Sequence, residues 1–67
     1  MPTYTKLSED EKNSIRESTT RSLEFQMYAL ELDLTAENAK VEPNAERVEF
    51  LISEIAQKEA QITAVNN

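Results

Sequence analysis

The chain has 67 residues, of which 30% are charged, with a net charge of −6 and no cysteine, histidine or glycine. A chain of this length forms one domain at most, spanning residues 1–67, and about 40% of its unfolded surface stays exposed even in a well-packed fold. Disulfides are excluded, and the usual ligands of structural zinc are absent. We therefore expect added stability from association with itself or with another protein.

The charge is unevenly distributed along the chain. Residues 1–22 carry four acids and four bases, whereas residues 23–67 carry nine acids and three bases. Since phosphate groups are bound through Lys and Arg, we expect neither nucleic acid nor anionic lipid as a direct partner. The sequence has no run of 18 apolar residues to span a bilayer, and "MPTYTKLSEDEK" lacks the apolar core of a signal peptide. These features predict a cytoplasmic protein.

The first helix is expected to begin at Ser8 or Glu9, after a flexible tail formed by residues 1–7. Ser8 can cap the free backbone N–H groups, and Glu11 can complete a capping box. The acids that follow Ser8 suit the positive end of the helix dipole. Glycine is absent and no proline lies between Pro2 and Pro43, so the sequence predicts one long helix over residues 8–40.

The stretch "LEFQMYALELDL", residues 23–34, fits two periods. Its apolar residues alternate as in a strand, but the alternation breaks phase between Ala29 and Leu30, which would move a strand's apolar residues to the other face. On a helical wheel one set falls within about 60°: Leu23, Met27, Leu30 and Leu34. We interpret the stretch as helix.

A second apolar set gathers on the opposite side of this helix: Phe25, Tyr28, Leu32, Ala36 and Ala39. Burying a large side chain contributes roughly 1.5–3 kcal/mol. One neighbouring helix can cover only one of the two sides. We expect the other to pair with a second copy through Phe25, Tyr28, Leu32 and Ala36, giving a four-helix bundle. The alternative is a binding face for a different protein.

Pro43 is expected to separate two helices. It lacks an N–H group, disfavours helical geometry at Glu42 and suits the first turn of a new helix. The sequence thus predicts helices over about residues 8–40 and 43–65, joined by a short connection as an antiparallel two-helix hairpin of the all-α class. A single helix kinked at Pro43 is the alternative, because Lys40 to Glu42 contain no glycine or asparagine to turn the chain.

The second helix shows a coiled-coil-like 4-3-4-3-4-3 spacing, with Leu51 widening the stripe: Val41, Ala45, Val48, Ile52, Ile55, Glu59 and Ile62. Val41 is expected to close the bend. Phe50 lies about 160° from this stripe, so it is either a lone exposed aromatic or an anchor in a second protein contact.

Enzymatic chemistry is not expected. Without histidine and cysteine there is no Ser-His-Asp or Cys-His arrangement, and without glycine there is no phosphate-cradling loop. Glu46 and Glu49 have the spacing used by magnesium-dependent all-α nucleotide pyrophosphohydrolases, but the acids of the first helix do not supply the second motif that those enzymes need. We predict no catalytic residue, metal, cofactor or small-molecule substrate.

The acidic surface of the second helix supports an alternative function. Glu46, Glu49 and Glu54 would lie on its exposed side, where they could dock on a host protein, as an adaptor or as an inhibitor that imitates a phosphate backbone. The segment "NSIRESTTRS", residues 13–22, extends beyond the reach of the second helix and is another place for a partner to bind.

Two segments, "LEFQMYALELDLTAENA" and "NAERVEFLISEIAQKEAQI", resemble small acidic helical-hairpin proteins encoded by tailed phages, particularly those of marine cyanobacteria. The resemblance implies an accessory component of the virion, or a factor in the host cytoplasm that binds a host protein. It assigns no role to any individual residue.

Overall fold

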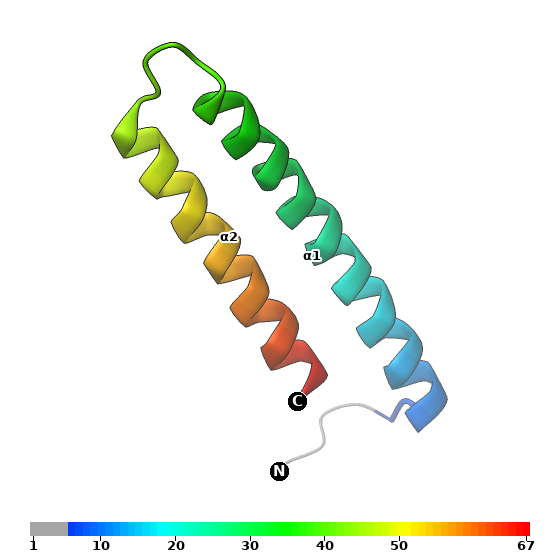
Figure 1. Cartoon of the computed structure of the whole chain (residues 1–67). Helices are drawn as coiled ribbons and strands as arrows, with labels where there is room; N and C mark the ends of the chain where they lie inside the picture. Colours follow the sequence, from blue (N-terminus) through cyan, green and yellow to red (C-terminus); the bar gives the residue numbers. More distant parts are fainter. Residues whose placement is uncertain (1–5) are drawn as a thin grey trace.

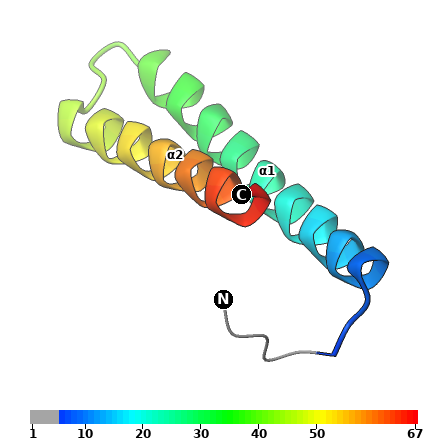
Figure 2. The same ribbon diagram turned by 90° about the horizontal axis from the view of Figure 1, so that it is seen from below.

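Two helices form the whole architecture of the part of the chain that the structure, a computed structural model, describes, residues 6–67. These are α1 (Glu9–Asn38) and α2 (Ala45–Asn66), which lie side by side and antiparallel (Figures 1 and 2). The molecule measures 54 × 19 × 13 Å, so it is a single layer two helices wide. The predicted all-α hairpin is confirmed, and the alternative of one kinked helix is wrong.

The start of α1 is the predicted capping box. The Ser8 Oγ accepts a hydrogen bond from the Glu11 backbone N–H at 3.2 Å, and the Ser8 N–H donates to Glu11 Oε1 at 3.0 Å. The hydrogen bonds from the Ser8 backbone and then from its side chain lower the pKa of Glu11. Lys6 and Leu7 precede the helix as predicted, whereas residues 1–5 of the predicted flexible tail lie outside the described residues.

The start of α2 differs from the prediction by two residues. The helix begins at Ala45, and its cap is Asn44, whose side-chain oxygen accepts hydrogen bonds from the N–H groups of Glu46 at 3.0 Å and Arg47 at 3.2 Å. Pro43 therefore precedes the cap instead of occupying the first turn. The asparagine satisfies two free N–H groups at once, which favours a helix that starts after it.

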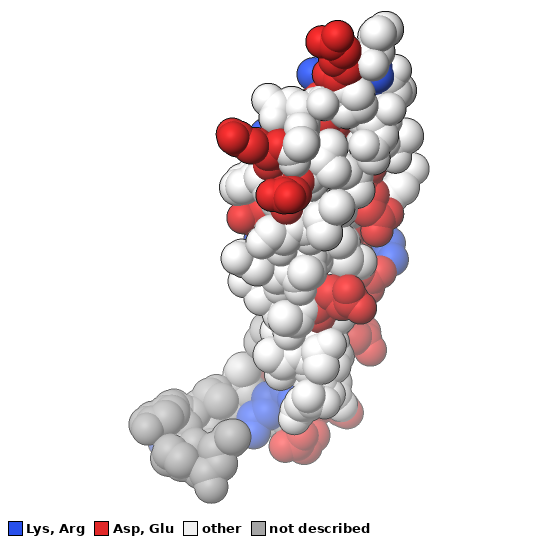
Figure 3. Space-filling view, turned by 60° about the vertical axis from the view of Figure 1, so that its left-hand side comes forward, with Lys and Arg blue, Asp and Glu red and all other residues white. Residues whose placement is uncertain are grey.

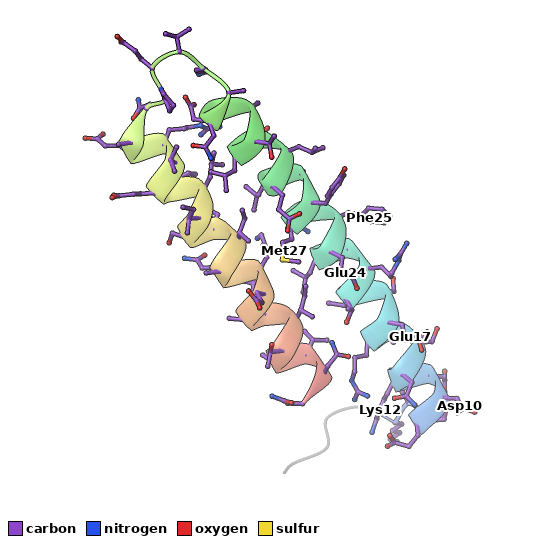
Figure 4. The ribbon with its side chains drawn as sticks, viewed as in Figure 1. Asp10, Lys12, Glu17, Glu24, Phe25 and Met27 are labelled. Carbon is purple, nitrogen blue, oxygen red and sulfur yellow. The ribbon has the colours of Figure 1, made fainter. Side chains whose placement is uncertain are left out.

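One side of α1 packs against α2. Leu23, Met27, Leu30 and Leu34 are half-buried, as the helical wheel predicted. Met27 points towards α2, whereas Phe25 points away from it (Figure 4).

The contact side of α2 is rotated relative to the prediction. Leu51, only 1% exposed, is its centre, and the half-buried residues on the same line continue the 3-4 spacing: Val48, Ile55, Lys58, Ile62 and Val65. Ile52 is 53% exposed and Glu59 is exposed, so their placement in the seam was wrong. Within α2, the 3-4 repeat that starts at Val48 contains more large apolar residues than the predicted repeat that starts at Val41. It therefore determines which side of α2 contacts α1.

The connection between the helices is closed by Glu37 and not by Val41. Val41 is fully exposed, which contradicts the prediction that it closes the bend. The buried Glu37 carboxylate accepts hydrogen bonds from the Asn44 N–H at 3.3 Å and from the Lys40 ammonium at 3.1 Å. These two hydrogen bonds, that from Asn44 first, lower the pKa of Glu37. Within residues 6–67, neither helix has the length and apolar character needed to cross a membrane.

Candidate protein interface

The hairpin buries little apolar surface by itself. Leu51 is the only fully buried hydrophobic residue among residues 6–67. The chain exposes 5462 Å², whereas a folded monomer of this mass exposes about 4300 Å² on average. Two helices in one layer can each cover only one side of the other, so large apolar side chains stay in contact with water.

The most continuous exposed apolar strip lies on α1, and we call it the outer face: Phe25, Tyr28, Leu32 and Ala36. Phe25, Tyr28 and Leu32 are 67%, 60% and 52% exposed, and Ala36 is exposed as well. At 100° per residue these positions lie about 180° from the line of Leu23 and Leu30 that contacts α2. The structure thus places all four predicted interface residues of α1 together, on the side that α2 does not cover.

Arg21 extends the outer face by one turn towards the N-terminus. Its guanidinium carbon lies 5.2 Å from the centre of the Phe25 ring, within the range of a cation–π interaction. The sequence reasoning did not single out Arg21 for this face. Its position four residues before Phe25, on the same side of the helix, was the available signal.

Carboxylates are absent from the outer face and lie on its flanks. On the helical wheel, Glu24 and Glu31 fall about 80–100° to one side of the face, and Asp33 falls about 100° to the other. The strip between Ser18 and Ala39 therefore carries one positive charge, from Arg21, and no negative one. An acidic chain thus presents a strip on which apolar contact does not require burying a carboxylate.

Phe50, the fifth predicted interface residue, belongs to a different surface. It is exposed on α2, about 110° around that helix from the line that contacts α1. Ile52, also exposed, falls on the other flank of α2. Because the outer face points away from α2, the structure does not bring Phe50 together with the four residues of α1.

The predicted acidic surface is divided. Glu46 and Glu49 are exposed in the first turns of α2, but Glu54 is half-buried, near the edge of the helix contact. Figure 3 shows the acidic side chains as separate groups between wide uncharged areas. Two of the three predicted acids therefore share a solvated surface, and the third stands apart.

A hollow of about 260 Å³ lies where α2 ends against α1. It is lined by Glu17, Thr20, Arg21, Glu24 and Asn66. The Asn66 side-chain amide donates to Thr20 Oγ1 at 3.0 Å and to the Ile62 carbonyl at 2.8 Å. This contact fixes the end of α2 at the level of Thr20, so the first three turns of α1 project beyond it, as Figure 1 shows.

Within residues 6–67 no three acidic side chains are grouped as metal ligands would be. No family model, no curated protein and no solved structure matches the chain. The resemblance to hairpin proteins of tailed phages stays a prediction.

Proposed function

We propose that the chain is a non-enzymatic protein–protein interaction module that associates with itself through the outer face of α1 and serves as a cytoplasmic assembly or scaffold component. The observation that carries the proposal is the exposure of Phe25, Tyr28 and Leu32 on one strip of a helix whose other side already contacts α2. Because these strips lie opposite the contact with α2, pairing two of them sets four helices side by side, with the two α1 helices in the middle and each covered on both sides.

Covering the outer face would add substantially to the stability of the hairpin. Each large apolar side chain contributes roughly 1.5–3 kcal/mol when it is fully buried, and small folds seldom retain more than about 3–5 kcal/mol from a single core. More than half of each of the three large side chains on the outer face is still exposed. Covering them on two copies at once adds a contribution comparable with the stability of the hairpin itself.

Light scattering after size-exclusion chromatography tests this proposal. The wild-type chain is expected at twice its mass of 7.7 kDa. Leu32→Glu places a charge in the contact and is expected to give a monomer with reduced helix content. Gln26→Glu adds the same charge at an exposed position of α1 off the outer face, and should leave the dimer intact. A helical wild-type monomer, or a dimer that survives Leu32→Glu, would refute the proposal.

The second candidate is an adaptor or inhibitor that docks on a host protein through the start of α2. The exposure of Glu46 and Glu49, together with the excess of nine acids over three bases after residue 22, supports it. The variant Glu46→Lys/Glu49→Lys should lose a partner recovered from a bacterial lysate by the wild type while keeping its helix content. Recovery of the same partner by both proteins would eliminate this surface.

A further inference from the structure

We propose that the two copies pair antiparallel along the outer face, with the Arg21 side chain of each copy at the C-terminal end of α1 in the other. This inference rests on the proposed self-association and adds its direction and register. The occupant of the outer face is thus a second copy of the same strip, turned end for end.

The spacing of the outer face supplies the register. Three residues of the outer face belong to a 4-3-4-3-4 repeat that passes beside Ala36 at Thr35: Arg21, Phe25, Tyr28, Leu32, Thr35 and Ala39. The repeat is symmetrical about the level of Leu30. A two-fold axis at that level sets Tyr28 of one copy opposite Leu32 of the other, as the facing positions of an antiparallel helix pair require.

Side-chain size favours this direction. In the antiparallel pair, the Phe25 ring of one copy meets Thr35 and Ala36 of the other, so a large group faces small ones. A parallel pair sets Phe25 against Phe25 and Ala36 against Ala36. Crowding at one level and a void at another would follow, and protein interiors tolerate neither at low cost.

Charge favours the same direction. The last turn of α1 contains no basic residue, and the ammonium of Lys40, just after the Ala39 cap, is ion-paired with Glu37 at 3.1 Å. A second cation at this end would therefore add to the stabilisation of the negative end of the helix dipole. In the antiparallel pair, Arg21 of the second copy reaches the level of Ala39, which caps this end. A parallel pair would instead bring the two Arg21 guanidinium groups to the same level, where like charges repel.

The exposed area is sufficient for such a contact. The surface of 5462 Å² exceeds the average for a monomer of this mass by about 1100 Å². A stable protein–protein interface of standard size removes about 800 Å² from each partner. The elongated hairpin as a whole therefore exposes more surface than one copy of a standard dimer needs to contribute.

Distances between spin labels separate the two directions, because the chain contains no native cysteine. Ser14→Cys labels an exposed site on the projecting part of α1. In the antiparallel dimer the two Ser14 labels are separated by about 32 residue steps, or roughly 50 Å at 1.5 Å per residue. In a parallel dimer they would be less than about 20 Å apart, at one level of neighbouring helices. Gln26→Cys, off the outer face and close to the two-fold axis, is the control, with a distance below about 30 Å expected in either direction.

A long Ser14 distance together with a short Gln26 distance supports the antiparallel pair. Short distances for both labels would overturn the antiparallel direction while leaving self-association intact. The lack of any defined distance for both labels, together with a monomeric mass, would overturn the proposed function itself and this inference with it.

Discussion

Asn44 and Glu37, seven residues apart, are joined across the turn, where the Asn44 N–H donates to Glu37 Oε2 at 3.3 Å. The other oxygen of the same carboxylate accepts from the Lys40 ammonium at 3.1 Å. Glu37 belongs to the last turn of α1, and Asn44 is the cap of α2. One buried carboxylate therefore holds the end of one helix to the beginning of the next.

The hairpin should be less stable in acid. Hydrogen bonds, from the Asn44 N–H first and from Lys40 second, hold the pKa of Glu37 below its ordinary value of 4.5. A carboxyl group whose pKa is lower in the folded than in the unfolded protein stabilises the fold at pH values above its unfolded pKa. This contribution is lost as the pH falls through the folded pKa.

Glu37→Gln should therefore lower the Tm at pH 7 and reduce the difference in Tm between pH 7 and pH 3, followed by circular dichroism. Some of the difference remains, because the pKa of Glu11 is also lowered, by its hydrogen bonds with Ser8. Glu31→Gln, at an exposed position of the same helix, is the control. Equal pH dependence in the two variants would show that Glu37 does not hold the turn.

Both helix caps should contribute measurably to the free energy of unfolding. Replacing Ser8 or Asn44 by alanine removes the oxygen that accepts from the first backbone N–H groups, and each change is expected to cost about 1 kcal/mol in the free energy of unfolding. Urea titrations measure this loss. Ser14→Ala, at an exposed position inside α1, is the matched control and should have little effect. A cost for Ser14→Ala equal to that of the cap variants would contradict the role of the caps.

The register of the helix contact can be tested at two neighbouring positions of α2. Leu51→Ala, at a side chain 1% exposed, is expected to cost about 2–5 kcal/mol. Ile52→Ala should cost much less, since that side chain is 53% exposed. If Ile52→Ala lowered the free energy of unfolding more than Leu51→Ala, Ile52 and not Leu51 would lie in the contact with α1.

In the antiparallel pair, a larger residue at position 36 should weaken the dimer. Ala36→Phe would set a second ring against Phe25 of the other copy, and overpacking costs typically about 1–3 kcal/mol. The dimer dissociation constant, from sedimentation, should rise by about tenfold or more. In a parallel pair the added rings would fill the gap at this level and tighten the dimer, so a lower dissociation constant would contradict the inferred direction.

Local signals made much of the fold predictable from sequence. The capping box at Ser8 and Glu11 and the absence of breakers up to Pro43 set the limits of α1 to within a residue or two. The heptad spacing of Leu23, Met27 and Leu30 selected the side of α1 that contacts α2. These features depend on neighbours within a turn or two along one helix, which is why the sequence alone reveals them.

The turn and the register of α2 were harder to predict, because they depend on contacts between α1 and α2, which are far apart in the sequence. Pro43 fits both the first turn of a helix and the position before its cap, and the hydrogen bonds accepted by Asn44 decide between them. Leu51 and Ile52 are equally apolar, so only the approach of α1 selects Leu51 for burial. The role of Glu37 depends on a contact across the turn, and one acid among thirteen carries no local signal of it.

The most direct test of the central claim, that a second copy completes the hairpin, is sedimentation equilibrium of the unmodified chain with circular dichroism at the same concentrations. On dilution from about 100 μM to about 1 μM, mass and helix content should fall together, because covering the outer face couples association to folding. The mass should approach twice 7.7 kDa at the upper end of the range. A constant mass of 7.7 kDa with full helix content at every concentration would contradict the claim.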